Sequence, residues 1–287
     1  MSEKILGAKK MFGIKTKIYR KLGLIPEQSQ VVTEYERLIK EYEQVPRFEK
    51  TSIKFKTFTD REYCFEIPDV ASFLSTYKEL FVEENYKFSD ESEKQYTIVD
   101  FGANIGLSML YFYEKFPNCK VIGFEADPNI FACLKKNIDN FQIDDIRCEI
   151  RNEAVWNENT TLNFYSQGGD GGRIAENGSE IVAVNAINGH SIFEELDHVD
   201  FLKIDIEGAE KVVIPAIKND LNKVDKIFIE YHSEIDKPQC MAEIFSVLEN
   251  VGFRLYINSV FSSVNPYIEV KDNTGFDLQF ELYGIRR

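Results

Sequence analysis

The sequence predicts a doubly wound α/β fold, with a mostly parallel sheet of seven strands that follows a smaller N-terminal cap. Three observations carry this prediction. From Tyr96 onward, apolar runs typical of buried strands alternate with helical segments. A glycine-rich turn joins the first of these strands to the first helix. The chain closes with two strand-like runs, over 253–260 and 276–285.

Residues 1–94 are expected to form the cap, and residues 95–287 the larger domain. Two stretches of the cap carry apolar side chains at helical spacing. Between them, apolar and polar residues alternate on both sides of a short polar turn, which is a hairpin pattern. The cap should therefore contain a helix, a β-hairpin and a second helix, over 28–44, 53–69 and 71–86.

Five strands are expected in the larger domain before the closing pair, over 97–102, 120–126, 146–151, 200–205 and 226–231. Their apolar runs suit the core of a parallel sheet. Helices should cover 105–113 and 238–251. Another helix should open at Asp127, a good N-cap with Pro128 at the first helical position.

The net charge, the apolar runs and the cysteine spacing limit which partners and which location we expect. The net charge of −14 disfavours a nucleic-acid partner, because phosphate binding needs an excess of Lys and Arg. No apolar run approaches the roughly 20 residues that span a bilayer, so we expect no transmembrane segment and a cytoplasmic location. The five cysteines are scattered without metal-binding spacing. We therefore expect reduced thiols and no zinc site.

Residues 1–23 form a basic arm, with seven basic residues against Glu3. Such an arm can touch an anionic membrane surface or an acidic partner, although a solvated tail is the simpler interpretation. The helix over 28–44 can pair with its counterpart in a homodimer or pack on its own sheet. A monomer and a homodimer therefore both stay open.

The glycine-rich segment 99–106, VDFGANIG, lies between a strand and a helix. Its glycines let backbone approach a ligand closely, and the helix N-terminus offers amide donors. The spacing departs from G-x-G-x-x-G, so the dinucleotide fingerprint is incomplete. An acid at the strand end, Asp100, followed by G-x-N-x-G suits the amino-acid end of S-adenosylmethionine. A tight turn without a ligand is the alternative.

Glu125 ends the next expected strand. An acid at this position can accept hydrogen bonds from both hydroxyls of a ribose, which a nucleoside ligand needs. A solvated glutamate at a strand end is the alternative. The two signals together favour a nucleoside cofactor more strongly than either does alone.

Further blocks complete a family pattern: VDFGANIGLS (99–108), GFEADPNIFACLKKNI (123–138), NEAV (152–155), FLKIDIEGAE (201–210) and IEYH (229–232). With these blocks the chain resembles the FkbM-type methyltransferases from about residue 52 to its end. These are class I S-adenosylmethionine enzymes that mostly methylate hydroxyl groups. The hairpin and helix before residue 95 resemble the lead-in of the family.

The resemblance implies a cofactor site. The methionine portion would be lined by Asp100, Gly102, Ala103, Asn104 and Gly106. The ribose would be held by Glu125, beside Ala126, and the adenine would lie near Asn152, Glu153 and Ala154. Asp205 would end the fourth strand and face the reactive sulfonium. The chain departs from the family pattern at Ala126, at Ile187–Asn188 and at Pro215, and the second and third departures concern the acceptor side.

A hydroxyl acceptor has to lose its proton, which calls for a base or a metal. We take Asp205, Glu230 and His232 as the catalytic candidates, with Glu207 nearby. The ordinary pKa of a histidine suits a base near neutrality, although His232 can instead be a packed structural residue. Asp205 and Glu230 can hold a divalent cation such as Mg²⁺, or serve as caps. Dipole complementation is enough to explain Glu207 and Glu210.

The resemblance implies that the acceptor is a hydroxyl of a sugar, a glycan or glycolipid, or a secondary metabolite, and it suggests a role in polysaccharide biosynthesis. The glycine-rich run 168–173 is interpreted as a loop near the active site or as a plain hairpin turn. Two alternative functions stay open. One is a non-catalytic sensor or scaffold that binds the nucleoside, and the other is an NAD-dependent oxidoreductase.

Overall fold

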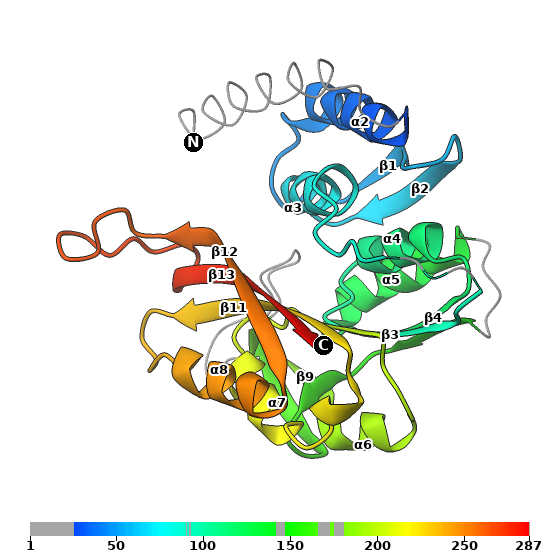
Figure 1. Ribbon diagram of the computed structural model, residues 1–287. Coiled ribbons are helices and arrows are strands. Elements are labelled where there is room, and N and C mark those ends of the chain that lie inside the picture. The colour runs from blue at the N-terminus through cyan, green and yellow to red at the C-terminus, as the bar shows by residue number, and fades with distance from the viewer. Residues whose placement is uncertain are drawn as a thin grey trace. The chain divides into compact units, whose positions relative to one another are not determined.

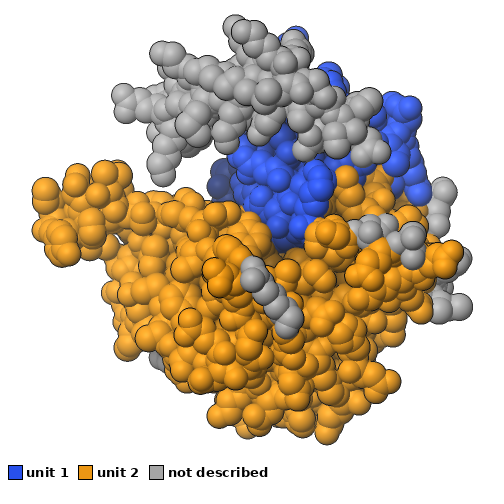
Figure 2. Space-filling view, viewed as in Figure 1, with its two compact units in different colours: residues 1–87 blue, residues 88–287 orange. Residues whose placement is uncertain are grey.

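The computed structural model describes residues 26–89, 91, 93–141, 147–165, 173–174 and 181–286. The chain divides into two compact units, Met1–Lys87 and Phe88–Arg287, which are coloured separately in Figure 2. The basic arm over 1–23 and residues 168–172 of the glycine-rich run lie outside the described residues.

The N-terminal unit contains the helix, hairpin and second helix that the sequence predicts (Figure 1). Its elements are α2 (Pro26–Tyr42), β1 (Thr51–Lys56), β2 (Glu62–Ile67), α3 (Val70–Tyr77) and the π-helical turn η1 (Lys78–Val82). Strands β1 and β2 pair antiparallel. The expected helix over 71–86 is confirmed as far as Val82, although its geometry becomes π-helical at Lys78, and only its last four residues lie outside the helix.

Aromatic side chains hold this unit together. The ring of Phe55 on β1 lies 5.0, 5.3 and 5.9 Å, centroid to centroid, from the rings of Phe65, Phe73 and Tyr77. The Tyr77 hydroxyl donates a hydrogen bond of 2.6 Å to the backbone carbonyl of Lys56. A two-stranded hairpin is marginal by itself, so α3 supplies the apolar surface that the hairpin needs.

The second unit is built on a seven-stranded sheet in the order β12-β13-β11-β10-β3-β4-β5. The strands are β3 (Tyr96–Phe101), β4 (Cys119–Phe124), β5 (Cys148–Arg151), β10 (Phe201–Ile204), β11 (Lys226–Glu234), β12 (Phe253–Ser262) and β13 (Phe276–Arg286). The first five are parallel, and β13 runs antiparallel to both of its neighbours. The predicted mostly parallel sheet with a closing antiparallel pair is confirmed.

The strand order reverses between β3 and β10. From β3 the chain proceeds to β4 and β5 on one side, whereas β10 and β11 lie on the other. In open α/β sheets, ligands bind outside the carboxyl ends of the strands at such a switch point. The topology therefore places a crevice where the glycine-rich turn follows β3.

Helices cover both faces of the sheet (Figure 1). They are α4 (Leu107–Lys115), α5 (Pro128–Asp139), α6 (Gly189–Glu194), α7 (Glu210–Ala216), the 3-10 turn η3 (Leu221–Lys223) and α8 (Met241–Asn250). Val99 and Phe101 of β3 belong to the core cluster that includes α6, α7 and α8. The intervening Asp100 bonds to Ser108 of α4 on the other face. Successive side chains of β3 thus point to opposite faces of the sheet and pack against a different layer of helices on each face, which confirms the doubly wound fold.

A second sheet, in the order β6-β9-β7-β8, lies between β5 and β10 in the sequence. It consists of β6 (Ala154–Trp156), β7 (Thr160–Tyr165), β8 (Arg173–Ile174) and β9 (Ile181–Asn188). The sequence analysis placed only a loop or a hairpin turn in part of this excursion. The strands were missed although β9 carries the apolar run IVAV over 181–184, a strand signal that the sequence analysis did not use.

No helix in the described part of the chain combines the length and the apolar character that crossing a bilayer requires.

The turn after β3 packs against the end of β10 with no space to spare. Gly102 has φ +90°, and a Cβ added there would lie 1.9 Å from the backbone oxygen of Asp205. Gly252, after α8, has nearly the same φ of +92°, but a Cβ added there would meet nothing within 4 Å. The two glycines share a left-handed backbone and differ in their surroundings.

We therefore expect Gly252→Ala to lower the free energy of unfolding by about 1–2 kcal/mol, the cost of left-handed geometry alone. Gly102→Ala should cost roughly 2 kcal/mol more, because the backbones of two strand ends must also move apart. Urea denaturation of both variants measures the difference. Equal losses would show that the contact between Gly102 and Asp205 is not tight.

Candidate active site

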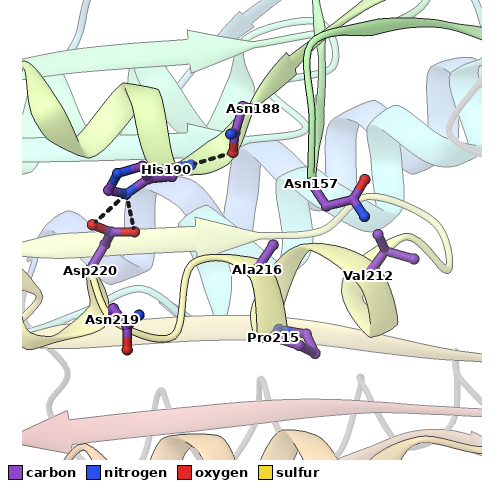
Figure 3. Close-up of a pocket in the computed structure, with 8 residues that line it drawn as sticks. All are labelled: Asn157, Asn188, His190, Val212, Pro215, Ala216, Asn219 and Asp220. Atoms are coloured by element: carbon purple, nitrogen blue, oxygen red, sulfur yellow. Dashed lines mark hydrogen bonds and ion pairs between the residues drawn. The ribbon is translucent and has the colours of Figure 1, made fainter.

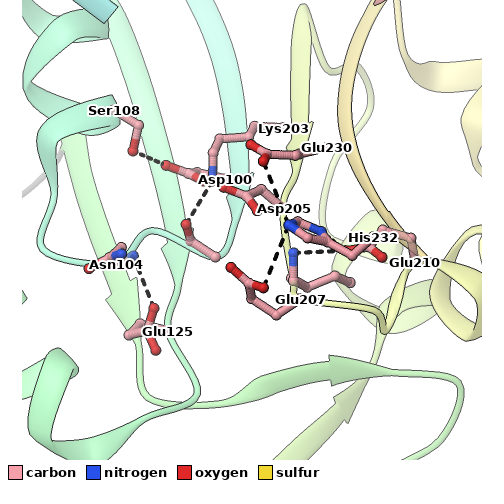
Figure 4. Close-up of polar contacts among 12 residues, drawn as sticks. Asp100, Asn104, Ser108, Glu125, Lys203, Asp205, Glu207, Glu210, Glu230 and His232 are labelled. Atoms are coloured by element: carbon pink, nitrogen blue, oxygen red, sulfur yellow. Dashed lines mark hydrogen bonds and ion pairs between the residues drawn. The ribbon is translucent and has the colours of Figure 1, made fainter. Parts of the chain in front are cut away.

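Carboxylates gather at the carboxyl ends of β3, β4, β10 and β11, around one lysine and one histidine (Figure 4). Of the sequence-predicted candidates, Asp100, Glu125 and Asp205 lie at the ends of β3, β4 and β10. Glu230 and His232 lie within β11, beyond the part of that strand that pairs with β10. The arrangement has three parts, namely the turn after β3, a cluster around Lys203 and a cluster around His232.

The turn after β3 is held from both sides. The backbone N–H groups of Gly102 and Ala103 donate to the carbonyl of Phe124, at 3.0 and 2.8 Å. Gly106 caps α4 in left-handed geometry, at φ +93°. The Ser108 hydroxyl donates to Asp100 over 2.5 Å, from the first turn of that helix. The glycine-rich turn is therefore fixed by hydrogen bonds to β4 and α4.

Glu125 is a buried carboxylate that bridges two loops. Its Oε2 accepts from the backbone N–H of Asn104 at 2.9 Å, and its Oε1 accepts from the backbone N–H of Asp127 at 2.8 Å. Burial raises the pKa of Glu125 to about 7, although the two backbone donors act in the opposite direction. Each oxygen can accept a second hydrogen bond.

The segment after β5 lies against the same loop. The Asn152 side-chain amide donates to the carbonyls of Glu125 and Ala126, at 2.8 and 3.2 Å. Glu153 is half-buried, and Ala154 is buried in the small core of the second sheet, where Ala126 also packs. The structure thus brings together the residues that the sequence analysis expected near an adenine.

Lys203 of β10 was not among the predicted site residues. Its Nζ lies 3.1 Å from Asp100 Oδ1 and 3.5 Å from Asp205 Oδ2, and it donates to the Gly102 carbonyl over 2.7 Å. Burial by itself lowers the pKa of this ammonium, but the carboxylates of Asp100 and Asp205 outweigh burial and raise it above the ordinary lysine value. The available signal was a single charge inside the apolar run of β10.

His232 of β11 is buried among carboxylates. Its Nε2 lies 3.5 Å from Glu207 and 3.6 Å from Glu230, and its Nδ1 lies 3.5 Å from Glu210. Burial by itself lowers the pKa of His232, but these three carboxylates outweigh burial and raise it well above 6.5. The three carboxylates therefore favour the protonated form of His232, an effect that the ordinary imidazole pKa used in the sequence analysis does not include.

Glu210 does more than complement a helix dipole. It is fully buried, and its carboxylate accepts from the backbone N–H groups of Ile206 and Gly208, at 3.1 and 3.0 Å. The turn between β10 and α7 needs this support because Glu207 has φ +53°. Glu210 thereby fixes the backbone that presents Asp205 and Glu207.

Asp205, Glu207 and His232 could hold a metal ion, since each offers one ligand atom and these atoms lie within 4.8 Å of one another. Two carboxylates and an imidazole suit a divalent cation only when the imidazole is neutral. The carboxylates around His232 favour its protonated form and so disfavour metal binding by its imidazole. The sequence analysis paired Asp205 with Glu230 instead, and Glu230 lies beside His232 rather than within this group.

A surface pocket of about 580 Å³ shares no residue with these clusters (Figure 3). Asn188 and Pro215, two of the departures from the family pattern, line it. Asn188 caps α6 by accepting from the His190 backbone N–H at 3.0 Å, and His190 Nδ1 lies 2.9 Å from the carboxylate of Asp220. These departures therefore concern the packing of α6 and α7.

Comparison with known proteins gives consistent matches. The model of the family described as "Methyltransferase FkbM domain" matches residues 100–255, a span that includes every site residue named above. "Methyltransferase 1" of Beauveria bassiana (strain ARSEF 2860) is 23% identical over 206 residues, which cover 63% of this chain and 81% of that protein. "31-O-demethyl-FK506 methyltransferase FkbM" of Streptomyces tacrolimicus is 24% identical over 218 residues, covering 64% and 82%.

Among solved structures, that of methyltransferase FkbM from Methylobacillus flagellatus KT is similar at a TM-score of 0.43. It is 14% identical in sequence, and the match covers 75% of this chain and 53% of that chain.

The charge of His232 gives a pH prediction. A group whose pKa is raised on folding contributes stability that is complete below its unfolded pKa, and this stability is lost as the pH rises through the folded pKa. His232→Gln should therefore lower the free energy of unfolding by about 3 kcal/mol at pH 6 and by less at pH 9.

Urea denaturation at the two pH values measures the difference between wild type and variant. Asn219→Ala, which alters an exposed side chain that does not titrate, is the control and should show no such trend. A loss that is the same at both pH values would contradict a protonated His232.

Proposed function

The chain belongs to the FkbM family of S-adenosylmethionine-dependent methyltransferases, and from that premise we propose that it methylates a hydroxyl oxygen. The acceptor we propose is a sugar, a glycan or glycolipid, or a secondary metabolite. One observation carries the proposal. The partly exposed carboxylate of Asp205 lies where the end of β10 touches the glycine-rich turn, so a proton acceptor stands beside the candidate cofactor loop.

We propose that the turn after β3 holds the methionine portion of the cofactor, through Asp100, Gly102, Ala103, Asn104 and Gly106. The free lone pairs on Glu125 suit the two ribose hydroxyls. The backbone that Asn152 fixes beside Ala126, together with Glu153 and Ala154, suits the adenine. These groups support a nucleoside ligand better than the NAD alternative, because the glycine spacing departs from the dinucleotide fingerprint.

The sulfonium of S-adenosylmethionine supplies an electrophilic methyl group when it is bound, so the protein chiefly aligns the acceptor and removes its proton. We assign the proton to a carboxylate oxygen of Asp205. The surrounding carboxylates favour the protonated form of His232, and its side chain is almost completely buried, so Asp205 is the better candidate for the base. We assign His232 and Glu230 to positioning, since their ion pair orders the acidic side chains around Asp205.

Asp205→Asn should reduce kcat by 10²- to 10⁴-fold, the range for loss of a general base, while the affinity for S-adenosylmethionine falls by at most about tenfold, because one carboxylate charge near the sulfonium is lost. Turnover is measured as the formation of S-adenosylhomocysteine from S-adenosylmethionine in the presence of each member of a panel of sugar acceptors. Isothermal titration measures cofactor binding. The exposed Asp197→Asn is the matched control. Unchanged turnover in Asp205→Asn would refute the assignment. Activity lost to a chelator and restored by Mg²⁺ would favour a metal in place of the base.

The pKa of Glu125 links cofactor binding to pH. Ribose hydroxyls that donate to Glu125 favour its ionised form, so binding should release a proton when the free group is protonated. The affinity for S-adenosylmethionine should therefore fall as the pH drops below about 7, towards tenfold per pH unit. Isothermal titration at pH 8.5 and pH 6, in buffers of different ionisation enthalpy, measures both effects. Glu125→Gln should bind more weakly and lose the pH dependence, whereas an unchanged pH dependence would contradict the role.

A further inference from the structure

Lys203 is a charged residue in the most protected part of the sheet. Its neighbours on β10 are Phe201, Leu202 and Ile204, all buried, and its own side chain is only 4% exposed. Placing an ammonium there costs several kcal/mol unless other groups compensate its charge. The compensating groups therefore indicate what the lysine does.

The compensating groups come from two strands. Asp100 and the Gly102 carbonyl belong to β3 and its turn, whereas Asp205 comes directly after β10, the strand of the lysine. The lysine donates a hydrogen bond to Gly102, while Asp205 lies 3.5 Å away, a distance that suits an ion pair without a good hydrogen bond. Lys203 thus connects the candidate cofactor loop directly to the candidate base.

We propose that Lys203 is a positioning residue for methyl transfer, which holds Asp205 against the cofactor loop and offsets part of the negative charge that Asp205 presents to the ligand. This inference rests on the proposed function. In this role Lys203, which was not among the predicted site residues, tunes the preference of the site for a cationic ligand over a neutral one.

The charge of the ligand makes the role measurable. S-adenosylmethionine carries a positive sulfonium, whereas S-adenosylhomocysteine has a neutral thioether at the same place. The carboxylate of Asp205 is 27% exposed, and a cation beside it weakens its attraction for a second cation. Removal of the Lys203 charge should therefore strengthen binding of the sulfonium form relative to the thioether form.

The experiment must avoid leaving Asp100 buried without its partner, since that alone would destabilise the fold. The comparison is between D100N and D100N/K203M. In the D100N background residue 100 carries no charge, so removing the lysine leaves no buried carboxylate unpaired there. D100N/K203Q provides a second neutral variant if the methionine does not fit. D100N/K211M is the matched control, because Lys211 pairs with Glu234 rather than with Asp205.

Isothermal titration with each ligand gives the ratio of the two dissociation constants. Between D100N and D100N/K203M, the preference for S-adenosylmethionine should rise roughly threefold to tenfold, and it should stay unchanged in D100N/K211M. An unchanged preference in folded D100N/K203M and D100N/K203Q would overturn the role and reduce Lys203 to a counter-ion for Asp100. A wild-type protein that binds neither ligand would instead overturn the proposed function.

Discussion

The contact between the turn after β3 and the end of β10 is the constraint on which the site depends. Gly102 lies so close to the backbone of Asp205 that no side chain fits between them. This contact sets the spacing of two parallel strands at the topological switch point, where the sheet opens towards a ligand. Once it is made, Asp100, Asp205 and the N-terminus of α4 occupy fixed places around one crevice.

Two buried basic residues, which their acidic neighbours favour as cations, lie in an otherwise acidic region. Lys203 lies among groups at the ends of β3 and β10, and His232 lies between Glu207, which follows β10, and Glu230, which belongs to β11. Each cation has more than one acidic neighbour, so each cluster keeps a negative character while its carboxylates stay in place. Some of the acidic residues behind the net charge of −14 are thus gathered at one site, whose negative charge suits a positively charged ligand.

The sequence predicted the features that depend on local pattern. Asp127 caps α5 as expected, and the glycine-rich turn and Glu125 lie together because both end strands of one parallel sheet. The role of Lys203 and the raised pKa of His232 could not be predicted, since both arise from residues that only the tertiary fold brings together. The second sheet was missed for a different reason, since the apolar run at the start of β9 is a strand signal that the sequence analysis did not take up.

The bond from Lys203 to Gly102 joins residues that are 101 positions apart in the chain. A polypeptide synthesised from its N-terminus therefore completes the glycine-rich turn long before its stabilising lysine exists. Contacts of such long sequence separation form slowly, because the intervening loop must close first. Until β10 docks beside β3, the carboxylate of Asp100 lacks its cation, so a nascent chain that stops short of residue 203 cannot form the cofactor crevice.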